Sequence, residues 1–506
     1  MTDVRPIIPG FYPDPSICRV GDVYYVVNSS FEYLPGLPIH ASTDLVTWRF
    51  VGNALTRPSQ IPEHRGNPSG SVYAPTIRHH DGRFWIVWTD TNQHGAGVGQ
   101  LLVHAEDAAG PWSDPVEIPG TVGIDPDLSW DEDGVCHLTW APHAEHLHPL
   151  GTVPIDPETG TLLAEPRLLW RGTGGAHPEG PHLYRIDGWW YLLAAEGGTE
   201  RGHSVTIARA RTLDGPFEPA PTNPILTHRG IQHPVQNAGH GDLVQLVNGS
   251  WAMVHLGVRP RGATPGFHLN GRETFLVGVD WVDGWPVVDE GRFTATPVDA
   301  SFHDDFTDAA LAGRWLGVGM FPETFTEPTG DGGGVVVRAG RGPGIPLLCV
   351  RAVDEEWTVD ARVDAAGGVA ALEVRIDEAH SYALVHDGRT VSAVLTIGPA
   401  VSTLATVESG PEAVLRLRAR LPEPTSRWGE PQPDIVDLVV VSAEGAETVL
   451  GSADGRYLST EVAGLFTGRV VGVRAVSGDV VLRSFSYTAG PRDAGDGRAA
   501  DHGAAG

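Results

Sequence analysis

Three carboxylates occupy corresponding places in three copies of a repeated sequence pattern, and their types and spacing suggest acid–base chemistry. Asp14, Asp125 and Glu179 lie seven to nine residues before a glycine that closes a tight turn. Carboxylates that are brought together repel one another, so their clustering does not by itself stabilise a fold. Their convergence would instead supply a protonated acid and an ionised base to one reaction.

Five repeated segments in the first half of the chain must position these carboxylates. Each runs from a Pro-, His- or acid-rich stretch into a short apolar strand, a glycine turn and an aromatic strand, a pattern typical of a β-hairpin. Short-strand repeats about fifty to sixty residues apart predict an all-β, five-bladed β-propeller. The segments are FYPDPSICRVGDVYYVV, SVYAPTIRHHDGRFWIVW, GIDPDLSWDEDGVCHLTW, HPEGPHLYRIDGWWYLLA and NAGHGDLVQLVNGSWAMV.

Equivalent positions on the innermost strands of a propeller surround one axis, so the three carboxylates are expected at one mouth of the channel. The same counting places Ala74 and His240 at this mouth from the other two blades. Opposite blades could hold Asp14 and Glu179 roughly 6.5 to 9.5 Å apart, the gap that an inverting glycosidase needs for its water.

Two domains and a tail are predicted from the distribution of strands. The propeller is expected over residues 1–298, where its last strand pattern closes. Alternating apolar and polar residues over 299–489 predict a β-sandwich of the jelly-roll or concanavalin-like type. Residues 490–506 are small and polar, which is typical of a disordered tail.

Composition limits the classes of partner. The formal net charge of −28 disfavours nucleic acid and anionic membrane surfaces. No secretory signal and no apolar run of membrane-spanning length is visible, so a cytoplasmic location is expected. Cys18, Cys136 and Cys349 are widely spaced, as expected of buried free thiols. The sequence does not decide whether the chain forms a homo-oligomer, which is possible.

The motifs around the carboxylates resemble those of a known family. YPDPS contains Asp14, GIDPD contains Asp125, EGPH contains Glu179, and AGHGDLVQ and GRETF follow in order. Together they resemble glycoside hydrolase family 43, whose members are five-bladed propellers often followed by a β-sandwich. The resemblance implies that Asp14 is the general base, that Asp125 orients the acid and tunes its pKa, and that Glu179 is the general acid.

The resemblance extends to two further site residues. Arg272 in GRETF corresponds to an active-site arginine that would bind sugar hydroxyls and moderate the repulsion among the carboxylates. His240 corresponds to a histidine near the axis, where some members hold a calcium ion or water. A core histidine with satisfied hydrogen bonds is the alternative for His240. No cofactor is otherwise required.

Phe31, Tyr73 and Ala74 are expected to contact the sugar, because aromatic faces pack against the C–H surface of a pyranose. Core packing is the alternative for the two aromatic residues. A typical β-xylosidase of the family has Trp where Tyr73 stands. This departure, with His268 and Asn270 just before the arginine motif, leaves the pentose open.

Several alternatives accompany these assignments. Asp127 competes with Asp125 for the axial position, and Glu196 is the second acid of its blade. A metal site at His143, His146 and His148 is disfavoured because no recognised ligand spacing accompanies these histidines.

The expected function is inverting exo-hydrolysis of terminal pentoses from xylan-derived oligosaccharides, with β-D-xylosidase activity favoured. α-L-Arabinofuranosidase activity on arabinoxylan is the alternative, because the two sugars present similar hydroxyl patterns. A non-catalytic carbohydrate-binding propeller is the remote alternative. Such a protein would have lost at least one of the three carboxylates, and all three are present here.

Overall fold

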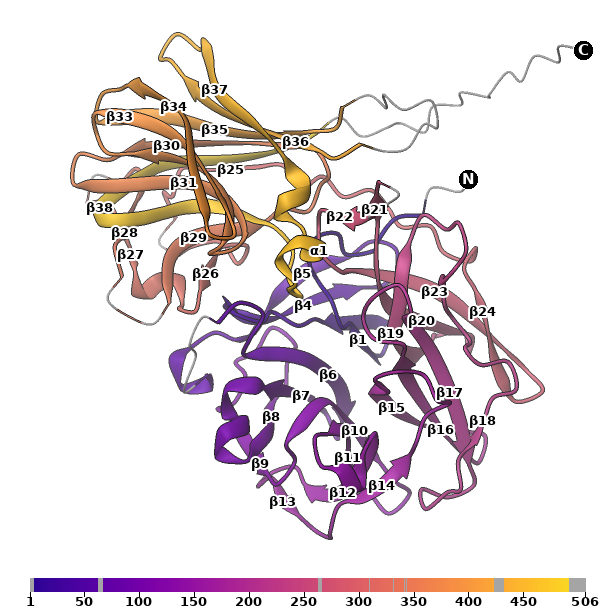
Figure 1. Ribbon diagram of the computed structural model, residues 1–506. Coiled ribbons are helices and arrows are strands. Elements are labelled where there is room, and N and C mark those ends of the chain that lie inside the picture. Colours follow the sequence, from indigo (N-terminus) through magenta and orange to yellow (C-terminus); the bar gives the residue numbers. More distant parts are fainter. Residues whose placement is uncertain are drawn as a thin grey trace, which may run out of the picture.

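The computed structural model describes residues 4–61, 67–262, 266–308, 310–330, 332–340, 342, 344–422 and 432–490. It is almost entirely β-structure and divides into a propeller and a sandwich that lie side by side (Figure 1). The predicted fold class is therefore confirmed. The predicted tail, from residue 491 on, lies outside the described residues.

Five antiparallel sheets in chain order form the blades of the propeller. In each blade the predicted hairpin supplies the first two strands, and later strands extend the sheet outwards. The blades are β1 (Ser16–Val20), β2 (Val23–Val27), β4 (Gly36–Ser42) and β5 (Arg49–Leu55); β6 (Val72–His80), β7 (Arg83–Asp90), β8 (Val98–Ala105) and β9 (Val116–Pro119); β10 (Gly123–Trp130), β11 (Cys136–Pro142), β12 (Leu150–Asp156), β13 (Thr161–Leu162) and β14 (Arg167–Trp170); β15 (Glu179–Ile186), β16 (Trp189–Glu196), β17 (Ser204–Ala210) and β18 (Glu218–Pro219); and β19 (Gln236–Gln245), β20 (Trp251–Val258), β23 (Glu273–Val282) and β24 (Trp285–Asp289).

The first strands of the blades surround the axis. β1 contacts both β6 and β19, β10 contacts β6 and β15, and β15 contacts β19, so the ring is closed. The N-terminal segment reinforces this closure, because Ile8 forms an antiparallel bridge with Thr274 of β23. Apolar clusters fill the spaces between neighbouring blades, and Trp88 and Trp140 are among their fully buried members.

The sandwich has two layers that share one long strand. β38 (Val470–Ala489) pairs through its first half with β29 and β31 and through its second half with β25, β28 and β30. One core lies between the layers and includes Leu372 and Leu415. The other strands are β25 (Phe302–Asp304), β26 (Leu316–Val318), β27 (Thr326–Pro328), β28 (Val335–Arg338), β29 (Ile345–Arg351), β30 (Trp357–Asp364), β31 (Gly368–Asp377), β32 (His380–His386), β33 (Thr390–Ile397), β34 (Ala400–Glu408), β35 (Glu412–Arg420), β36 (Ile435–Val441) and β37 (Glu447–Asp454).

The two domains share a sheet edge and a small core. β3 (Tyr33–Leu34), which follows the second strand of the first blade, pairs with β26 of the sandwich. Phe11, Tyr33, Leu347 and Val470 pack in one apolar cluster at this junction. Hydrogen bonds and apolar contacts therefore hold the sandwich against the first blade.

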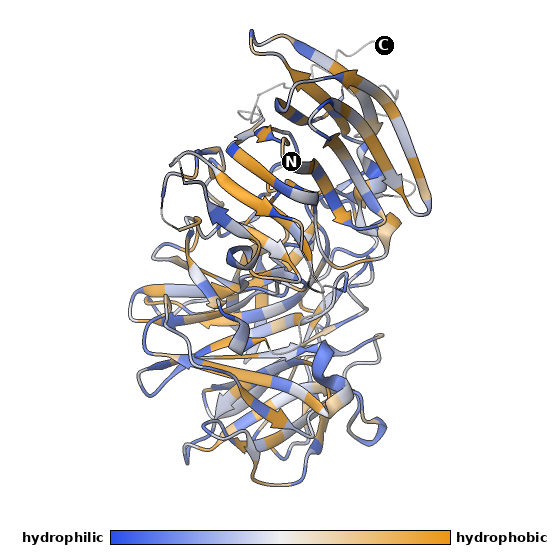
Figure 2. Cartoon of the chain, turned by 90° about the vertical axis from the view of Figure 1, so that its left-hand side faces the viewer, coloured by the Kyte–Doolittle hydropathy of each residue, from blue (hydrophilic) through white to orange (hydrophobic). Residues whose placement is uncertain are grey.

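Helices are few and short. The 3-10 helices are η1 (Pro58–Gln60), η2 (Thr91–Ala96), η3 (Glu145–Leu147), η4 (Pro322–Thr324) and η5 (Gly455–Leu458), and the α-helix is α1 (Thr460–Ala463). None of the helices in the described ranges has the length and apolarity that a membrane span requires. Most apolar residues lie in strands, and the connecting loops are mainly hydrophilic (Figure 2). The three cysteines are free and buried, as predicted.

Candidate active site

A cavity of about 430 Å³ opens at the axis and brings the predicted site residues together. It is bounded by the first strands of the blades on one side and by a loop of the sandwich on the other. All eight predicted site residues line it: Asp14, Phe31, Tyr73, Ala74, Asp125, Glu179, His240 and Arg272.

Bulges in the inner strands aim side chains at this cavity. In three blades the inner strand has a register shift at this point, and in the first blade Asp14 comes just before β1. The four residues there have positive φ, between 51° and 57°, and each is followed two residues later by a polar residue that does not line the cavity. The equivalent residue in the fourth blade is Gly180, not Glu179, because Gly180 has the positive φ and the register shifts between Glu179 and His182. The positive-φ residues are Asp14, Asp125, Gly180 and His240, followed by Ser16, Asp127, His182 and Asp242.

Asp14 is prepared to act as a base. Its carboxylate accepts hydrogen bonds from Arg272 Nη1 at 2.9 Å and from Ser29 Oγ at 2.5 Å. Burial alone would raise the pKa of Asp14, but the charges of Arg272 and the hydrogen bond from Ser29 outweigh it, so the pKa lies below its ordinary value. Asp14 therefore carries a negative charge at neutral pH.

Glu179 is prepared to act as an acid. Burial, followed by the negative charge of Asp14, raises the pKa of Glu179 to about 7, although Arg272 opposes the rise. A carboxyl group with this pKa still holds a proton near neutral pH and can donate it to a leaving oxygen.

Asp125 differs electrostatically from the sequence prediction. We expected its negative charge to raise the pKa of Glu179, but burial and the charges of Glu179 and Asp14 raise the pKa of Asp125 itself well above its ordinary value. Asp125 Oδ2 accepts a hydrogen bond from the Gly180 N–H at 3.0 Å. Asp125 is therefore placed to orient the backbone beside the acid, while Asp14 supplies the charge.

His240 lies between the carboxylates without a close hydrogen bond to either. Its Nδ1 is 3.9 Å from Asp14 Oδ1 and 4.0 Å from Asp125 Oδ2. Burial lowers the pKa of His240 to about 4, so the ring is neutral. Calcium requires several oxygen ligands. Asp14 is already occupied by Arg272, and no cluster of three potential metal ligands occurs around His240 among the described residues. A calcium ion near His240 therefore stays a prediction, and water would have to supply most of its oxygen ligands.

Aromatic rings form one wall of the cavity, and one of them comes from the sandwich. Phe31 lies edge-on to Tyr73 at 5.3 Å and stacks on Phe466 at 6.2 Å between ring centroids. The Arg272 guanidinium lies 5.7 Å from the Phe31 ring and 5.4 Å from the Phe466 ring. No sequence motif marks Phe466, which reaches the site only because the two domains pack together.

Contacts between α1 and the propeller hold the Phe466 loop. His268 Nδ1 lies 2.7 Å from Glu461 Oε1, and the Phe466 N–H donates to Ser69 Oγ at 2.8 Å. Asn270 donates to the Val353 carbonyl at 3.2 Å. His268 and Asn270 do not line the cavity, so they bind the sandwich rather than face a sugar.

Comparison with known proteins agrees with this geometry. Residues 4–286 match the family described as Glycosyl hydrolases family 43. The chain belongs to this family. It is a glycoside hydrolase.

The family 43 relatives match one or both domains. Non-reducing end alpha-L-arabinofuranosidase BoGH43B of Bacteroides ovatus is 36% identical over 93% of this chain and 90% of its own length. Xylosidase/arabinosidase of Butyrivibrio fibrisolvens is 45% identical over 57% of this chain and 56% of its own. The crystal structure of xylan beta-1,4-xylosidase from Bacillus halodurans has 29% identity and a TM-score of 0.85 over 96% of this chain and 99% of that one.

The two alternative acids in this family 43 chain have other partners. Asp127 accepts hydrogen bonds from Arg78 Nη2 at 2.6 Å and from the Leu183 N–H at 2.9 Å. Glu196 accepts from the N–H and hydroxyl of Thr173, from the Gly175 N–H and from the Thr206 hydroxyl, at 2.7–2.9 Å. Neither residue lines the cavity, and Glu196 instead holds the loop that precedes Glu179.

Other lining residues carry no motif in the sequence. Thr199 Oγ1 accepts a hydrogen bond from Arg272 Nη1 at 3.1 Å, and His177 and Glu200 add polar groups to the cavity. The GG turn at 197–198 is the one local signal that could have marked this segment.

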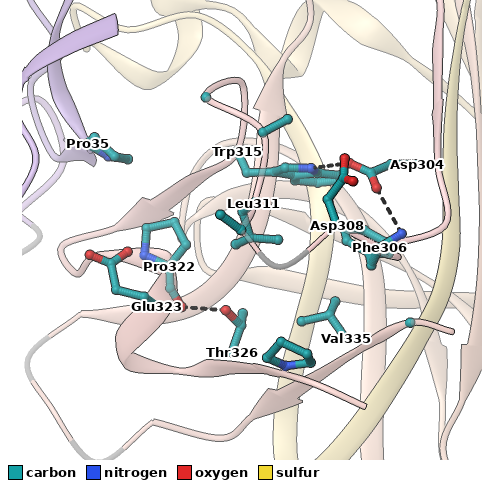
Figure 3. Close-up of a pocket in the computed structure, with 15 residues that line it drawn as sticks. Pro35, Asp304, Phe306, Asp308, Leu311, Trp315, Pro322, Glu323, Thr326 and Val335 are labelled. Atoms are coloured by element: carbon teal, nitrogen blue, oxygen red, sulfur yellow. Dashed lines mark hydrogen bonds between the residues drawn. The ribbon is translucent and has the colours of Figure 1, made fainter. Parts of the chain in front are cut away.

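A second cavity, of about 410 Å³, is lined by the sandwich and by Pro35 of the propeller, and it shares no residue with the first (Figure 3). Asp304 and Thr326 among its polar side chains are hydrogen-bonded within it, and Thr326 donates to the Pro322 carbonyl at 2.8 Å. Asp304 accepts hydrogen bonds from Trp315 Nε1 at 2.8 Å and from the Phe306 N–H at 2.9 Å.

Proposed function

We propose that this glycoside hydrolase removes terminal pentoses from xylan-derived oligosaccharides with inversion at the anomeric carbon. The observation that carries the proposal is the opposite protonation of two carboxyls in one cavity. Asp14 is held as a carboxylate by Arg272, and the pKa of Glu179 is raised to about 7.

In the proposed reaction, Glu179 donates its proton to the glycosidic oxygen as the bond from this oxygen to the anomeric carbon breaks. Asp14 takes a proton from the water that attacks the anomeric carbon on the opposite face. Asp125 acts as a positioning residue through its hydrogen bond to the Gly180 N–H. Each product gains one hydroxyl group, at the anomeric carbon of the released pentose and at the former glycosidic oxygen. Asp14 then loses its proton and Glu179 regains one, which restores both carboxyls for the next cycle.

The walls of the cavity support exo action on a short chain end. Phe31 and Tyr73 offer apolar faces to the sugar ring, and Arg272 offers N–H donors to its hydroxyls. Phe466 of the sandwich bounds the cavity on the remaining side, which favours one terminal residue over a chain that runs through.

β-D-Xylosidase activity is the preferred specificity, and α-L-arabinofuranosidase activity is the second candidate. The second is favoured by Tyr73, which stands where Trp is expected of a β-xylosidase, and by the name of the Bacteroides ovatus relative. The Butyrivibrio relative is named for both activities. Hydrolysis rates of nitrophenyl β-D-xylopyranoside and nitrophenyl α-L-arabinofuranoside decide between them, and a preference for the arabinoside above about tenfold reverses the order.

Proton NMR of the products tests the reaction itself. Xylobiose and an arabinosylated xylo-oligosaccharide are the substrates, and the first anomer of the released pentose is recorded before mutarotation. Inversion gives α-xylose first from a β-linked substrate. A first product of unchanged configuration would refute the inverting mechanism, and binding without release would indicate a carbohydrate-binding protein.

The proposed mechanism uses water and the protein's own carboxyls, so treatment with a chelator is expected to leave the hydrolysis rate unchanged. A cytoplasmic location would limit the substrates to short imported oligosaccharides, which cell fractionation tests. Whether the chain forms a homo-oligomer is tested by size-exclusion chromatography.

A further inference from the structure

Outside the active site, two histidines and a glutamate converge on a small cavity at the fifth blade. His228 and His233 lie in the connection from β18 to β19, and Glu290 follows β24. One ligand atom from each of the three residues lies within 4.8 Å of the others, and this is the one such group of three among the described residues. The cavity, of about 90 Å³, shares no lining residue with the active site.

The hydrogen bonds of the histidines leave one ring nitrogen of each directed at the glutamate. His228 Nδ1 lies 2.8 Å from the carbonyl oxygen of Val235. His233 Nδ1 lies 3.0 Å from the same oxygen and also faces the Val235 N–H, which donates to it at 3.2 Å. The Nε2 atoms lie 2.8 Å and 3.5 Å from the same Glu290 oxygen. A backbone carbonyl at Nδ1 is the common way in which a protein orients a metal-binding imidazole.

The arrangement fits a metal better than a neutral hydrogen-bonded group. Both ring nitrogens of His228 face an acceptor, but a neutral imidazole has only one N–H to donate. A metal ion at Nε2 satisfies the second nitrogen and the carboxylate together. Tetrahedral zinc with bonds of about 2.0 to 2.1 Å separates its ligand atoms by about 3.3 Å, close to the two distances observed here.

The exposure of two of the three side chains lets an ion reach the cluster from solvent. The side chain of Glu290 is 44% exposed and that of His233 is 21% exposed, whereas that of His228 is 2% exposed. His255 lines the same cavity and also directs Nδ1 to a backbone carbonyl, that of Leu256, at 2.9 Å. Arg5 lines the cavity too, and its positive charge opposes a cation, so the ligands must outweigh it.

We propose that His228, His233 and Glu290 form a binding site for a divalent transition-metal ion of the zinc type, with water in the remaining position. The ion would tie the connection between the fourth and fifth blades to the segment that leaves the propeller for the sandwich. Its role is structural, because no residue of the site reaches the active-site cavity.

The test is Zn²⁺ binding by the full, tag-free chain. Metal content after dialysis against Zn²⁺ should be one ion per chain, and added Zn²⁺ should raise the melting temperature by a few degrees. Glu290→Gln and His233→Gln should each remove both effects. Asp131→Asn is the matched control, since it breaks a pair of the same 2.8 Å length, to His137, that involves a single histidine.

Three outcomes overturn the proposal. The wild-type chain fails to retain stoichiometric zinc, or both Gln variants bind zinc as the wild type does, or the variants lower the melting temperature equally with and without zinc. The last result would make the cluster an ion pair only. Hydrolysis of the aryl xyloside by both variants should stay within about twofold of wild type, which separates this proposal from the proposed catalytic function.

Discussion

Two layers of acids lie around the axis of the propeller, and they differ in the number of their partners. The cavity layer holds Asp14, Asp125 and Glu179 with Arg272 as their one paired arginine. The deeper layer holds Asp127 and Asp242, which share Arg78. Glu179 is half-buried, but Asp14 and Asp125 are buried like Asp127 and Asp242, so burial alone cannot explain why only the first layer is suited to acid–base chemistry.

Asp242 shows what a full set of partners does. It accepts hydrogen bonds from Arg78 at 2.8 Å, Ser16 at 2.6 Å, Tyr184 at 2.5 Å and the Ile17 N–H at 2.9 Å. Burial would raise the pKa of Asp242, but the charge of Arg78 and these donors lower it well below its ordinary value. Asp242 therefore stays ionised and has a structural role.

The donors of the cavity layer are distributed unevenly among its acids. Asp14 takes Arg272 and Ser29, Asp125 takes one N–H, and the raised pKa of Glu179 keeps its proton available. A carboxyl with few hydrogen-bond donors around it therefore keeps its proton and can act as the general acid. A carboxyl with several donors is ionised, and it acts either as the base or as a structural anion.

The largest effect is expected from Asp14→Asn. The amide cannot take a proton from water, so hydrolysis of xylobiose and of an aryl xyloside should both fall by about 10³- to 10⁴-fold. Steady-state rates check this expectation. Substantial activity on either substrate would remove Asp14 from the role of base.

Glu179→Gln should separate the two substrates. Xylobiose has a poor leaving group and should lose about 10³-fold in kcat, whereas a nitrophenyl glycoside, which needs little protonation, should lose far less. Equal losses on both substrates would contradict the assignment of Glu179 as the acid. The matching variant Glu196→Gln should not discriminate between the substrates.

Asp242→Asn should affect stability instead of the acid–base chemistry. Removing one partner of the buried pair with Arg78 should reduce the free energy of unfolding by about 3–5 kcal/mol. Because the folded-state pKa of Asp242 is depressed, the wild-type advantage should be full above about pH 4 and disappear as the pH falls further. Urea unfolding at several pH values measures it, and a variant as stable as wild type at pH 7 would refute the comparison.

The pH dependence of kcat/KM should reflect the cavity layer. Activity should fall as the pH rises through about 7, because Glu179 must hold its proton. Arg272 lowers the pKa of both Asp14 and Glu179, so Arg272→Gln should move both limbs of the profile to higher pH. Unmoved limbs would show that Arg272 serves only to bind sugar.

The smallest effect is expected from Glu461→Gln. It weakens the 2.7 Å contact with His268 that anchors the loop of Phe466, so KM should rise by about two- to fivefold with little change in kcat. Phe466→Ala should raise KM further. A change confined to kcat would contradict a role in substrate binding.

Local sequence patterns were enough to predict the blades and half of the residues that line the cavity. Repeated hairpins with a turn glycine are local patterns, and local counting from that glycine found Asp14, Asp125 and His240 because each copy folds alike. The same counting reached Glu179, one residue before the equivalent position Gly180, because the number of residues from the turn glycine back to this position differs from blade to blade.

Which acid is ionised, and which loop bounds the site, depend on contacts between segments that are far apart in the sequence. The pKa of Asp125 depends on Glu179 and Asp14 across the axis, and Phe466 and the cluster of His228, His233 and Glu290 assemble from distant segments. Electrostatic interactions and ligand sets depend on distances of a few ångströms between such segments, and these distances exist only once the ring has closed.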